Sequence, residues 1–156
     1  MEYRSFSVGD LRSEDRTRSP SVLRVYSRLA PKPKELLANP ERSYIREGMV
    51  LEYSIKQKKR KKRYLFLFTD VLLVTNKRGT SFVPRYYVHL GSDIQVEEVN
   101  DSSDVEFPEL EFRLYAPQRN FIFFAGSRAQ KKYWVQDLDD AINKRPSAQL
   151  GAYSFY

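Results

Sequence analysis

The sequence contains no cysteine and a single histidine. Without cysteine the chain has no disulfides, no thiolate metal sites and no thiol catalysis, and a reducing compartment is expected. The one histidine, His89, lies between Val88 and Leu90 in an apolar stretch, where a structural role is expected rather than acid–base chemistry. Histidine-based catalysis therefore has one candidate residue only.

Long apolar runs are also missing. No window approaches the roughly 20 apolar residues that span a bilayer, and the N-terminal MEYRSFSVGD lacks a signal-peptide core. We therefore expect a soluble, intracellular protein that contacts membranes only from the surface. The sequence also lacks a glycine-rich phosphate loop, a nucleophile motif and metal-ligand spacing, so we expect no enzyme activity and no cofactor.

Positive charge is present, but it is local. The net charge is +7. Seven basic residues lie within eight positions: Lys56, Lys58, Lys59, Arg60, Lys61, Lys62 and Arg63. The rest of the chain is balanced, because removing these seven from 27 Lys and Arg leaves 20, against 20 Asp and Glu. This predicts an exposed cationic loop that attracts anionic partners, although a purely solubilising loop has the same composition.

The segments around this loop predict one folded domain with two extensions. Residues 1–43 are basic and rich in Ser and Pro, and we interpret them as a flexible arm. Within the arm, an apolar patch over 22–29 has the spacing of a short amphipathic helix that docks on its own domain or on a partner. Residues 44–144 form the predicted domain, and residues 145–156 a C-terminal tail.

Alternating apolar residues and turn signals predict a mainly β domain. The expected strands are 48–55, 62–68, 71–76, 82–90, 93–99, 109–115 and 121–125. A helix follows, with Ser127 and Gln130 as a capping box and Pro146 beyond its end. Trp134 and Leu138 lie on its apolar face, while Lys131 and Asp137 are expected to lie away from it. The fold class is a seven-stranded antiparallel bent barrel or sandwich capped by one C-terminal helix.

These features together resemble the pleckstrin-homology (PH) domain. The matching residues are Glu47-Gly48 opening the first strand, Lys61-Lys62-Arg63-Tyr64 opening the second, and Trp134 in the helix. YLFLFTDVLLVTNK is most similar to PH domains of Rho-family exchange factors and Rho GTPase-activating proteins, and LLANPERSYIREG resembles the junction after a Dbl-homology domain.

The resemblance implies binding of phosphoinositide head groups beside the loop joining the first two strands. Lys61 and Arg63 match the family's basic pair, but Glu52 stands where tight binders have a Lys, and Val74 and Thr75 stand where a Tyr is often found. These departures predict low specificity. The expected lipid-contacting residues are Lys56, Lys58, Lys59, Arg60, Lys61, Lys62, Arg63, Lys77 and Arg78.

We therefore expect a non-catalytic signalling module that is cytoplasmic and binds the anionic membrane surface peripherally. Seven basic residues would contribute at most about 7 kcal/mol near an anionic leaflet. The alternative is a regulatory module that docks a small GTPase or a neighbouring domain, with Tyr86, Tyr87, His89 and the N-terminal arm as contacts. Exchange activity itself is not expected, because residues 1–43 are too short for the helical catalytic domain. Nucleic-acid binding is less favoured, because the aromatic residues after the basic run are needed for the core.

Overall fold

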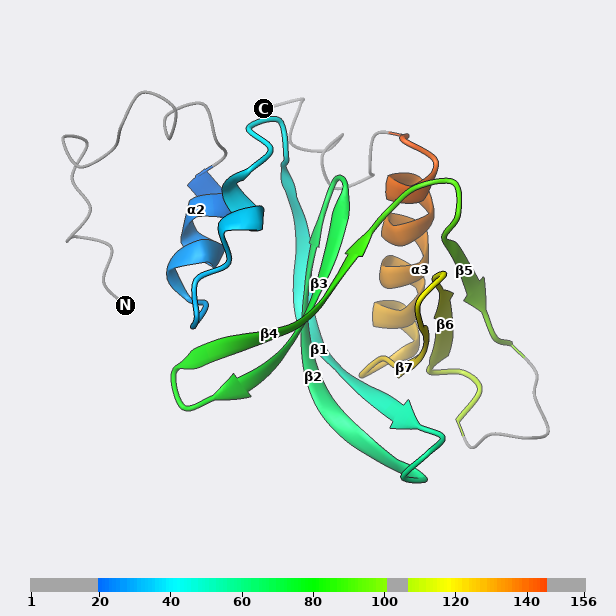
Figure 1. Ribbon diagram of the computed structural model, residues 1–156. Helices are drawn as coiled ribbons and strands as arrows, with labels where there is room; N and C mark the ends of the chain where they lie inside the picture. The colour runs from blue at the N-terminus through cyan, green and yellow to red at the C-terminus, as the bar shows by residue number, and fades with distance from the viewer. Residues whose placement is uncertain (1–19, 101–106, 146–156) are drawn as a thin grey trace, which may run out of the picture.

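The computed structural model describes residues 20–100 and 107–145, and the seven strands among them form one antiparallel sheet in the order β4-β3-β2-β1-β7-β6-β5 (Figure 1). The sheet is strongly bent, and a C-terminal helix packs against its β5–β6 side. This architecture confirms the predicted PH-like fold class. The strands are β1 (Tyr44–Ser54), β2 (Lys59–Phe68), β3 (Val71–Arg78), β4 (Ser81–His89), β5 (Gln95–Glu98), β6 (Glu111–Tyr115) and β7 (Asn120–Phe124).

The strands form because their side chains alternate between two faces, and in this protein both faces carry apolar residues. On β2, Leu65 and Leu67 belong to the core on the inner face, while Phe66 and Phe68 belong to a second apolar cluster on the outer face. The inner core also contains Val50, Leu72, Val74, Phe112, Leu114, Phe121 and Phe123. A sheet with two apolar faces needs a cover on each.

The helix α3 (Arg128–Ile142) covers the inner core. Its first turn is capped as predicted, since the backbone N–H of Gln130 donates to Ser127 Oγ at 3.1 Å. Trp134 and Leu138 are buried, and the Trp134 ring lies against Gly48 of β1, where a Cβ would meet Cζ2 at 3.5 Å. No helix among the described residues is long and apolar enough to cross a membrane.

The polar face expected for α3 is wrong at two positions, since Lys131 and Asp137 are both buried. Lys131 donates to the backbone carbonyls of Val99 and Pro108, and Arg46 of β1 donates to Asp137 Oδ2 at 2.8 Å. Burial lowers the pKa of Lys131 and raises the pKa of Asp137. Long-range partners, which helical periodicity cannot indicate, allow these charges to be buried.

A second layer covers the outer face of β2, β3 and β4. It consists of the helix α2 (Pro20–Ser27), the short 3-10 helix η3 (Lys34–Leu37) and the chain between them. Val22, Val25, Leu29 and Leu36 are buried against the outer apolar cluster. The expectation of a flexible arm over 1–43 therefore needs a correction for residues 20–43, which pack on the domain because the outer face is too apolar to stay exposed. The expectations for residues 1–19 and 146–156 lie outside the described residues.

Two charged clusters fasten this layer. Arg28 donates from both terminal nitrogens to Glu47 of β1, at 2.9 and 3.1 Å, and the hydroxyls of Tyr44 and Tyr64 donate to the same carboxylate. Burial alone would raise the pKa of Glu47, but these hydrogen bonds outweigh it and hold that pKa below its usual value.

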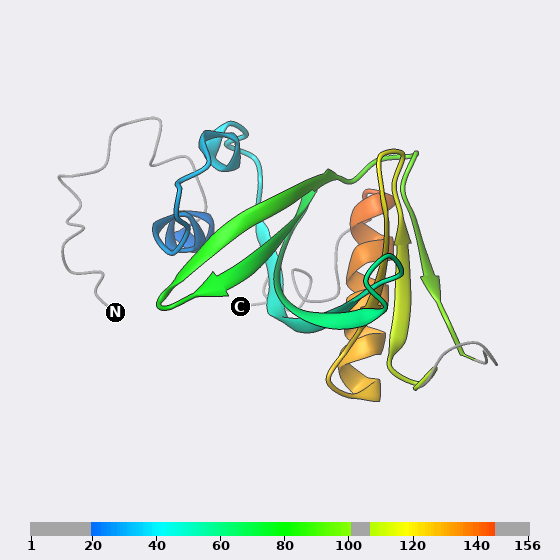
Figure 2. The ribbon, with the colours of Figure 1, turned by 60° about the horizontal axis from the view of Figure 1, so that its bottom comes forward.

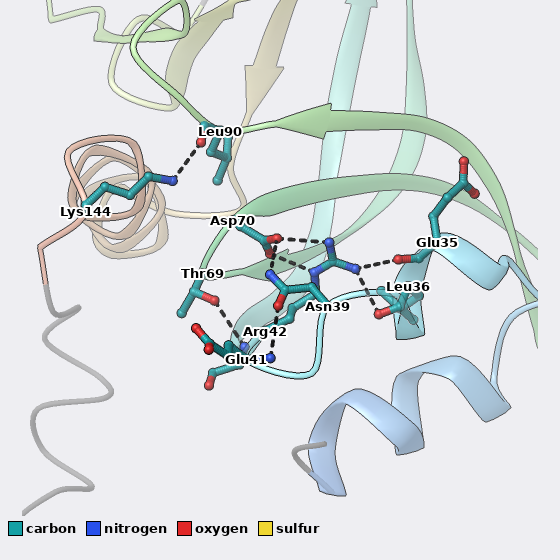
Figure 3. Close-up of polar contacts among 10 residues, drawn as sticks. Glu35, Leu36, Asn39, Glu41, Arg42, Thr69, Asp70, Leu90 and Lys144 are labelled. Carbon is teal, nitrogen blue, oxygen red and sulfur yellow. Dashed lines mark hydrogen bonds and ion pairs between the residues drawn. The ribbon is translucent and has the colours of Figure 1, made fainter. Parts of the chain in front are cut away.

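The second cluster lies at the turn between β2 and β3 (Figure 3). Arg42 donates from Nε to Asp70 Oδ1 at 2.7 Å and from Nη1 to the carbonyls of Glu35 and Leu36, while Asn39 donates to Asp70 Oδ2. Thr69 and Asp70 form this turn, in the gap between the expected strands 62–68 and 71–76. The Asp70 carboxylate also holds the chain that leads from η3 into β1, because Asn39 and Arg42 of that chain donate to it. This contact was not predicted from the sequence.

Candidate functional site

The turn between β1 and β2 carries the exposed part of the basic run. Only residues 55–58 form the turn, because Lys59 already pairs with Ser54 at the start of β2. Ser54 stabilises the turn through two hydrogen bonds. Its carbonyl oxygen accepts from the backbone N–H of Lys58 at 2.6 Å, and its hydroxyl oxygen accepts from the backbone N–H of Gln57 at 3.1 Å. The expected long basic loop is therefore a short turn followed by a basic strand. The basic side chains consequently alternate between two faces.

Four lysines in the turn and in the first residues of β2 are exposed: Lys56, Lys58, Lys59 and Lys62. Within residues 20–100 and 107–145, none of their side chains forms an ion pair or a hydrogen bond. Leaving such charges solvated costs little, and they remain available to an external anion. These four residues, here called the tip lysines, are the part of the predicted set that the structure leaves accessible and concentrated.

Lys61 and Arg63 point instead toward the inner face, in register with Glu52 and Val50 of β1. Arg63 is only 8% exposed, and it donates from Nε to Glu52 Oε1 at 3.0 Å and from Nη1 to Asn76 Oδ1 at 2.8 Å. The guanidinium expected to bind a head group is therefore already bound inside the molecule. Lys61 is partly exposed and has no such partner among the described residues.

A second arginine completes this inner cluster. Arg119, in the turn between β6 and β7, donates from Nη2 to Glu52 Oε2 at 2.7 Å and lies over the rings of Tyr86 and Phe121, at 4.5 and 5.1 Å. Glu52 itself is 3% exposed. Two guanidinium groups thus converge on one buried carboxylate, so that each of them is already paired with a negative charge.

The remaining predicted residues lie elsewhere. Arg60 faces outward, with its guanidinium over the rings of Phe107 and Phe124 at 5.5 and 5.0 Å. Lys77 and Arg78 lie at the end of β3, at the tip of the β3–β4 hairpin. That tip is well separated from the β1–β2 turn in both views (Figures 1 and 2). The nine predicted residues therefore do not form one patch.

A shallow hollow lies behind the β1–β2 turn, where β1 diverges from β7 after their pairing at Leu51 and Glu52. Its volume is about 290 Å³, and it is lined by residues that include Tyr53, Ile55, Arg113, Tyr115 and Arg119. A second hollow of about 220 Å³ lies between β4 and the β6–β7 turn. No group of side chains that could hold a metal ion occurs within the described ranges.

Arg119 was not among the site residues predicted from the sequence. Arg119 is 67 residues from Glu52, so no local spacing could pair them. The one usable signal was Glu52 itself, since a carboxylate on the inner face of a strand requires a cationic partner.

Both the sequence and the fold are similar to those of known proteins. The profile of the PH domain family matches residues 44–143. Mouse FERM, ARHGEF and pleckstrin domain-containing protein 2 is 35% identical over 111 residues, covering 69% of this chain and 10% of that protein. The chain spans between a tenth and a fifth of the length of the curated relatives it matches, 10% in that case and 18% in another.

Solved structures agree on the fold. A Vav1 exchange factor structure, described for the role of its PH and C1 domains, has a TM-score of 0.62 at 23% identity, covering 79% of this chain and 31% of that one. The DH/PH domains of PDZ-RhoGEF in complex with activated RhoA have a TM-score of 0.60 at 16% identity, covering 80% and 39%. At these identities the likeness concerns the fold alone.

Proposed function

This chain belongs to the PH domain family, and from that premise we propose that it is a non-catalytic signalling module that binds anionic membrane lipids through the β1–β2 turn. The observation that carries the proposal is the set of four exposed tip lysines, two on the β1–β2 turn and two at the start of β2. The ligand class is a negatively charged bilayer surface, phosphoinositides included. The binding is peripheral and cytoplasmic, because anionic lipids concentrate in the cytoplasmic leaflet.

Low head-group specificity follows from the inner cluster. Stereospecific recognition of an inositol phosphate needs basic side chains fixed around a pocket, and Arg63 and Arg119 are both engaged by Glu52. The tip lysines are exposed and flexible, so they respond to charge density rather than to the positions of individual phosphates. Binding of this kind distinguishes anionic from neutral membranes.

The strength of the attraction is limited. Each lysine near an anionic leaflet contributes about 1 kcal/mol, so the four tip lysines contribute about 4 kcal/mol. That free energy corresponds to a dissociation constant of about 1 mM. Salt weakens it further, because the Debye length at physiological ionic strength is about 8 Å. Charge alone therefore gives a weak, reversible attachment.

The test is vesicle co-sedimentation of the chain and of a variant with Lys56, Lys58, Lys59 and Lys62 changed to Gln. We expect the native chain to bind vesicles containing phosphatidylserine at low salt, and the variant to lose most of that binding. The matched control changes Lys77 and Arg78 to Gln on the other hairpin and is expected to bind much as the native chain does. Equal binding by native chain and tip variant would refute the proposal.

A second candidate function is docking of a small GTPase. The hollow beside β4 is lined by residues that include Tyr86, Tyr87 and His89, and the PDZ-RhoGEF relative of this fold has been solved with activated RhoA. Tyr86 packs on Phe121 and Arg119, so His89 is the exposed member of the predicted three. A pull-down of a Rho-type GTPase that survives neutralisation of the tip lysines but is lost in His89→Ala would favour this function.

A further inference from the structure

Ser27 is the last residue of α2, in the second layer that covers the outer face of the sheet. Its side chain is exposed, and its hydroxyl donates to the carbonyl oxygen of Arg24 at 2.7 Å. The spacing Arg24-x-x-Ser27 is the one that arginine-directed protein kinases recognise. Other serines have an arginine at the same spacing, Ser21 and Ser81 among them. The surroundings of Ser27 in the fold therefore distinguish it, rather than the spacing alone.

Two arginines beside Ser27 attach α2 to β1. Arg28, the next residue, donates from both terminal nitrogens to the Glu47 carboxylate, yet its side chain remains 30% exposed. Arg24 lies one helical turn before Ser27, and its guanidinium is 6.0 Å from the centroid of the Tyr44 ring. Both positive groups near the Ser27 hydroxyl are thus already used to hold the second layer on the sheet.

A third basic residue, Lys32, stabilises the C-terminal end of α2. Its Nζ donates to the carbonyl oxygens of Tyr26, Ser27 and Leu29, at 3.3, 3.1 and 3.2 Å. The last carbonyls of a helix have no partner within the helix and carry partial negative charge, so a lysine compensates both. A negative group added at the same end has the opposite effect.

We propose that Ser27 is a phosphorylation site, and that its phosphate loosens the second layer from the sheet. A protein kinase transfers the terminal phosphoryl group of ATP to Ser27 Oγ. The bond from that phosphorus to the bridging oxygen of ADP breaks, a P–O bond to Oγ forms, and the hydroxyl proton is released. The phosphoserine carries a charge of about −1.5 to −2 at neutral pH. This inference goes beyond the proposed function and does not depend on lipid binding.

The phosphate weakens the attachment of the layer for two reasons. It lies at the negative end of α2, where added negative charge opposes the helix dipole. It also attracts Arg28 and Lys32 away from the oxygens that they now contact, and the partly buried Glu47 carboxylate then loses its counter-charge. A helix of eight residues does not persist without its tertiary contacts, so α2 has little stability of its own to resist this change.

A short bridge between the second layer and β4 reports on the opening of the layer. The backbone N–H of Ala30 donates to the carbonyl of Phe82, and the N–H of Phe82 donates to the carbonyl of Arg28, both at 3.0 Å. Leu29, between the two bonds, is 1% exposed. These amide hydrogens exchange with solvent only when the layer opens there, so their exchange rates measure how often it does.

The first experiment tests whether Ser27 accepts a phosphate. The native chain is incubated with ATP and calmodulin-dependent protein kinase II, an arginine-directed kinase, and the phosphorylated residues are identified by mass spectrometry. We expect phosphate on Ser27 and its absence from Ser27→Ala at that position. If the native chain carries no phosphate on Ser27 after exhaustive incubation, the assignment of the site is overturned.

The second experiment tests what the phosphate does, by placing phosphoserine at position 27 through genetic code expansion. The matched control carries phosphoserine at position 21, in the first turn of the same helix, where the dipole favours a negative charge. We expect the amides of Ala30 and Phe82 to exchange about tenfold faster when Ser27 is phosphorylated, and no faster than in the native chain when Ser21 is phosphorylated.

Amides of β7 serve as the internal reference, since that strand lies on the other side of β1 in the sheet. Their exchange should be the same in all three proteins. Native-like exchange of Ala30 and Phe82 in the Ser27-phosphorylated chain would overturn the loosening of the layer. An equal acceleration of the β7 amides would also overturn it, because the phosphate would then destabilise the whole domain rather than the second layer.

Discussion

At the scale of single residues, the sign of one buried charge decides what the inner face of the sheet can bind. Glu52 neutralises Arg63 and Arg119 within the molecule. A buried carboxylate between two guanidinium groups is stable because each charge has a partner, and removing one partner leaves the others uncompensated. The same residue that completes this cluster therefore excludes a phosphate from it.

Glu52→Gln provides the corresponding prediction. We expect the variant to lose about 3 kcal/mol of unfolding free energy, because the two guanidinium groups lose their counter-charge. We also expect inositol hexakisphosphate to raise the melting temperature of the variant more than that of the native chain, since Arg63 and Arg119 then lack an intramolecular counter-charge and can pair with phosphate instead. Thermal unfolding with and without the compound measures both effects.

The control for this variant is Glu35→Gln, which removes an exposed carboxylate on η3 and is expected to behave as the native chain. If inositol hexakisphosphate raises the melting temperatures of the native chain and of Glu52→Gln equally, Glu52 does not prevent Arg63 and Arg119 from binding phosphate.

At the scale of elements, the sequence predicted what depends on local pattern. Alternation placed the seven strands to within a few residues, and the Ser127 cap and the buried Trp134 located α3. It did not predict that β2 would begin at Lys59, because a basic run has low strand propensity until a neighbouring strand pairs with it. An amphipathic helix over 22–29 that docks on its own domain was one of the two predicted alternatives, and α2 agrees with it. The contact of Arg28 with Glu47 was not predicted, since the two residues lie 19 positions apart.

The attachment of α2 to the sheet predicts a pH dependence. The pKa of Glu47 is depressed in the folded state, so its stabilising contribution is fully present above its ordinary value of 4.5 and is lost as the pH falls through the folded-state pKa. Glu47→Gln should lose about 1–3 kcal/mol of unfolding free energy at neutral pH, because a carboxylate that accepts four hydrogen bonds is replaced by one oxygen acceptor.

Urea unfolding followed by Trp134 fluorescence at several pH values between neutral and acid tests this. The difference between the native chain and Glu47→Gln should shrink as the pH falls below 4.5. If the difference in unfolding free energy between the two proteins stays constant over that pH range, the charge of Glu47 does not stabilise the packing of the second layer on the sheet.

At the scale of the whole molecule, the fold distributes the basic residues over different surfaces. Lys56 and Lys58 lie on the β1–β2 turn, and Lys59 and Lys62 follow in the first residues of β2. Arg63 is buried against Glu52, and Arg119 reaches the same carboxylate from an exposed position in the β6–β7 turn. Lys77 and Arg78 lie on the other hairpin. Net charge and composition predicted an anion-attracting protein, but they could not predict this division, which depends on strand register and on the angle between two hairpins. As a result, four lysines of the basic run of seven are exposed together at one end of the β1–β2 hairpin, while Arg63 is buried.

The most direct test of this account is the binding of the native chain to vesicles that differ only in the positional isomer of one phosphoinositide, at low and high salt. We predict equal affinity for isomers of equal charge and a steep loss of affinity with added salt. The affinity that remains at high salt should not depend on the isomer. A preference for one isomer that persists at high salt would contradict the account, because it would require the inner arginines to bind a head group despite Glu52.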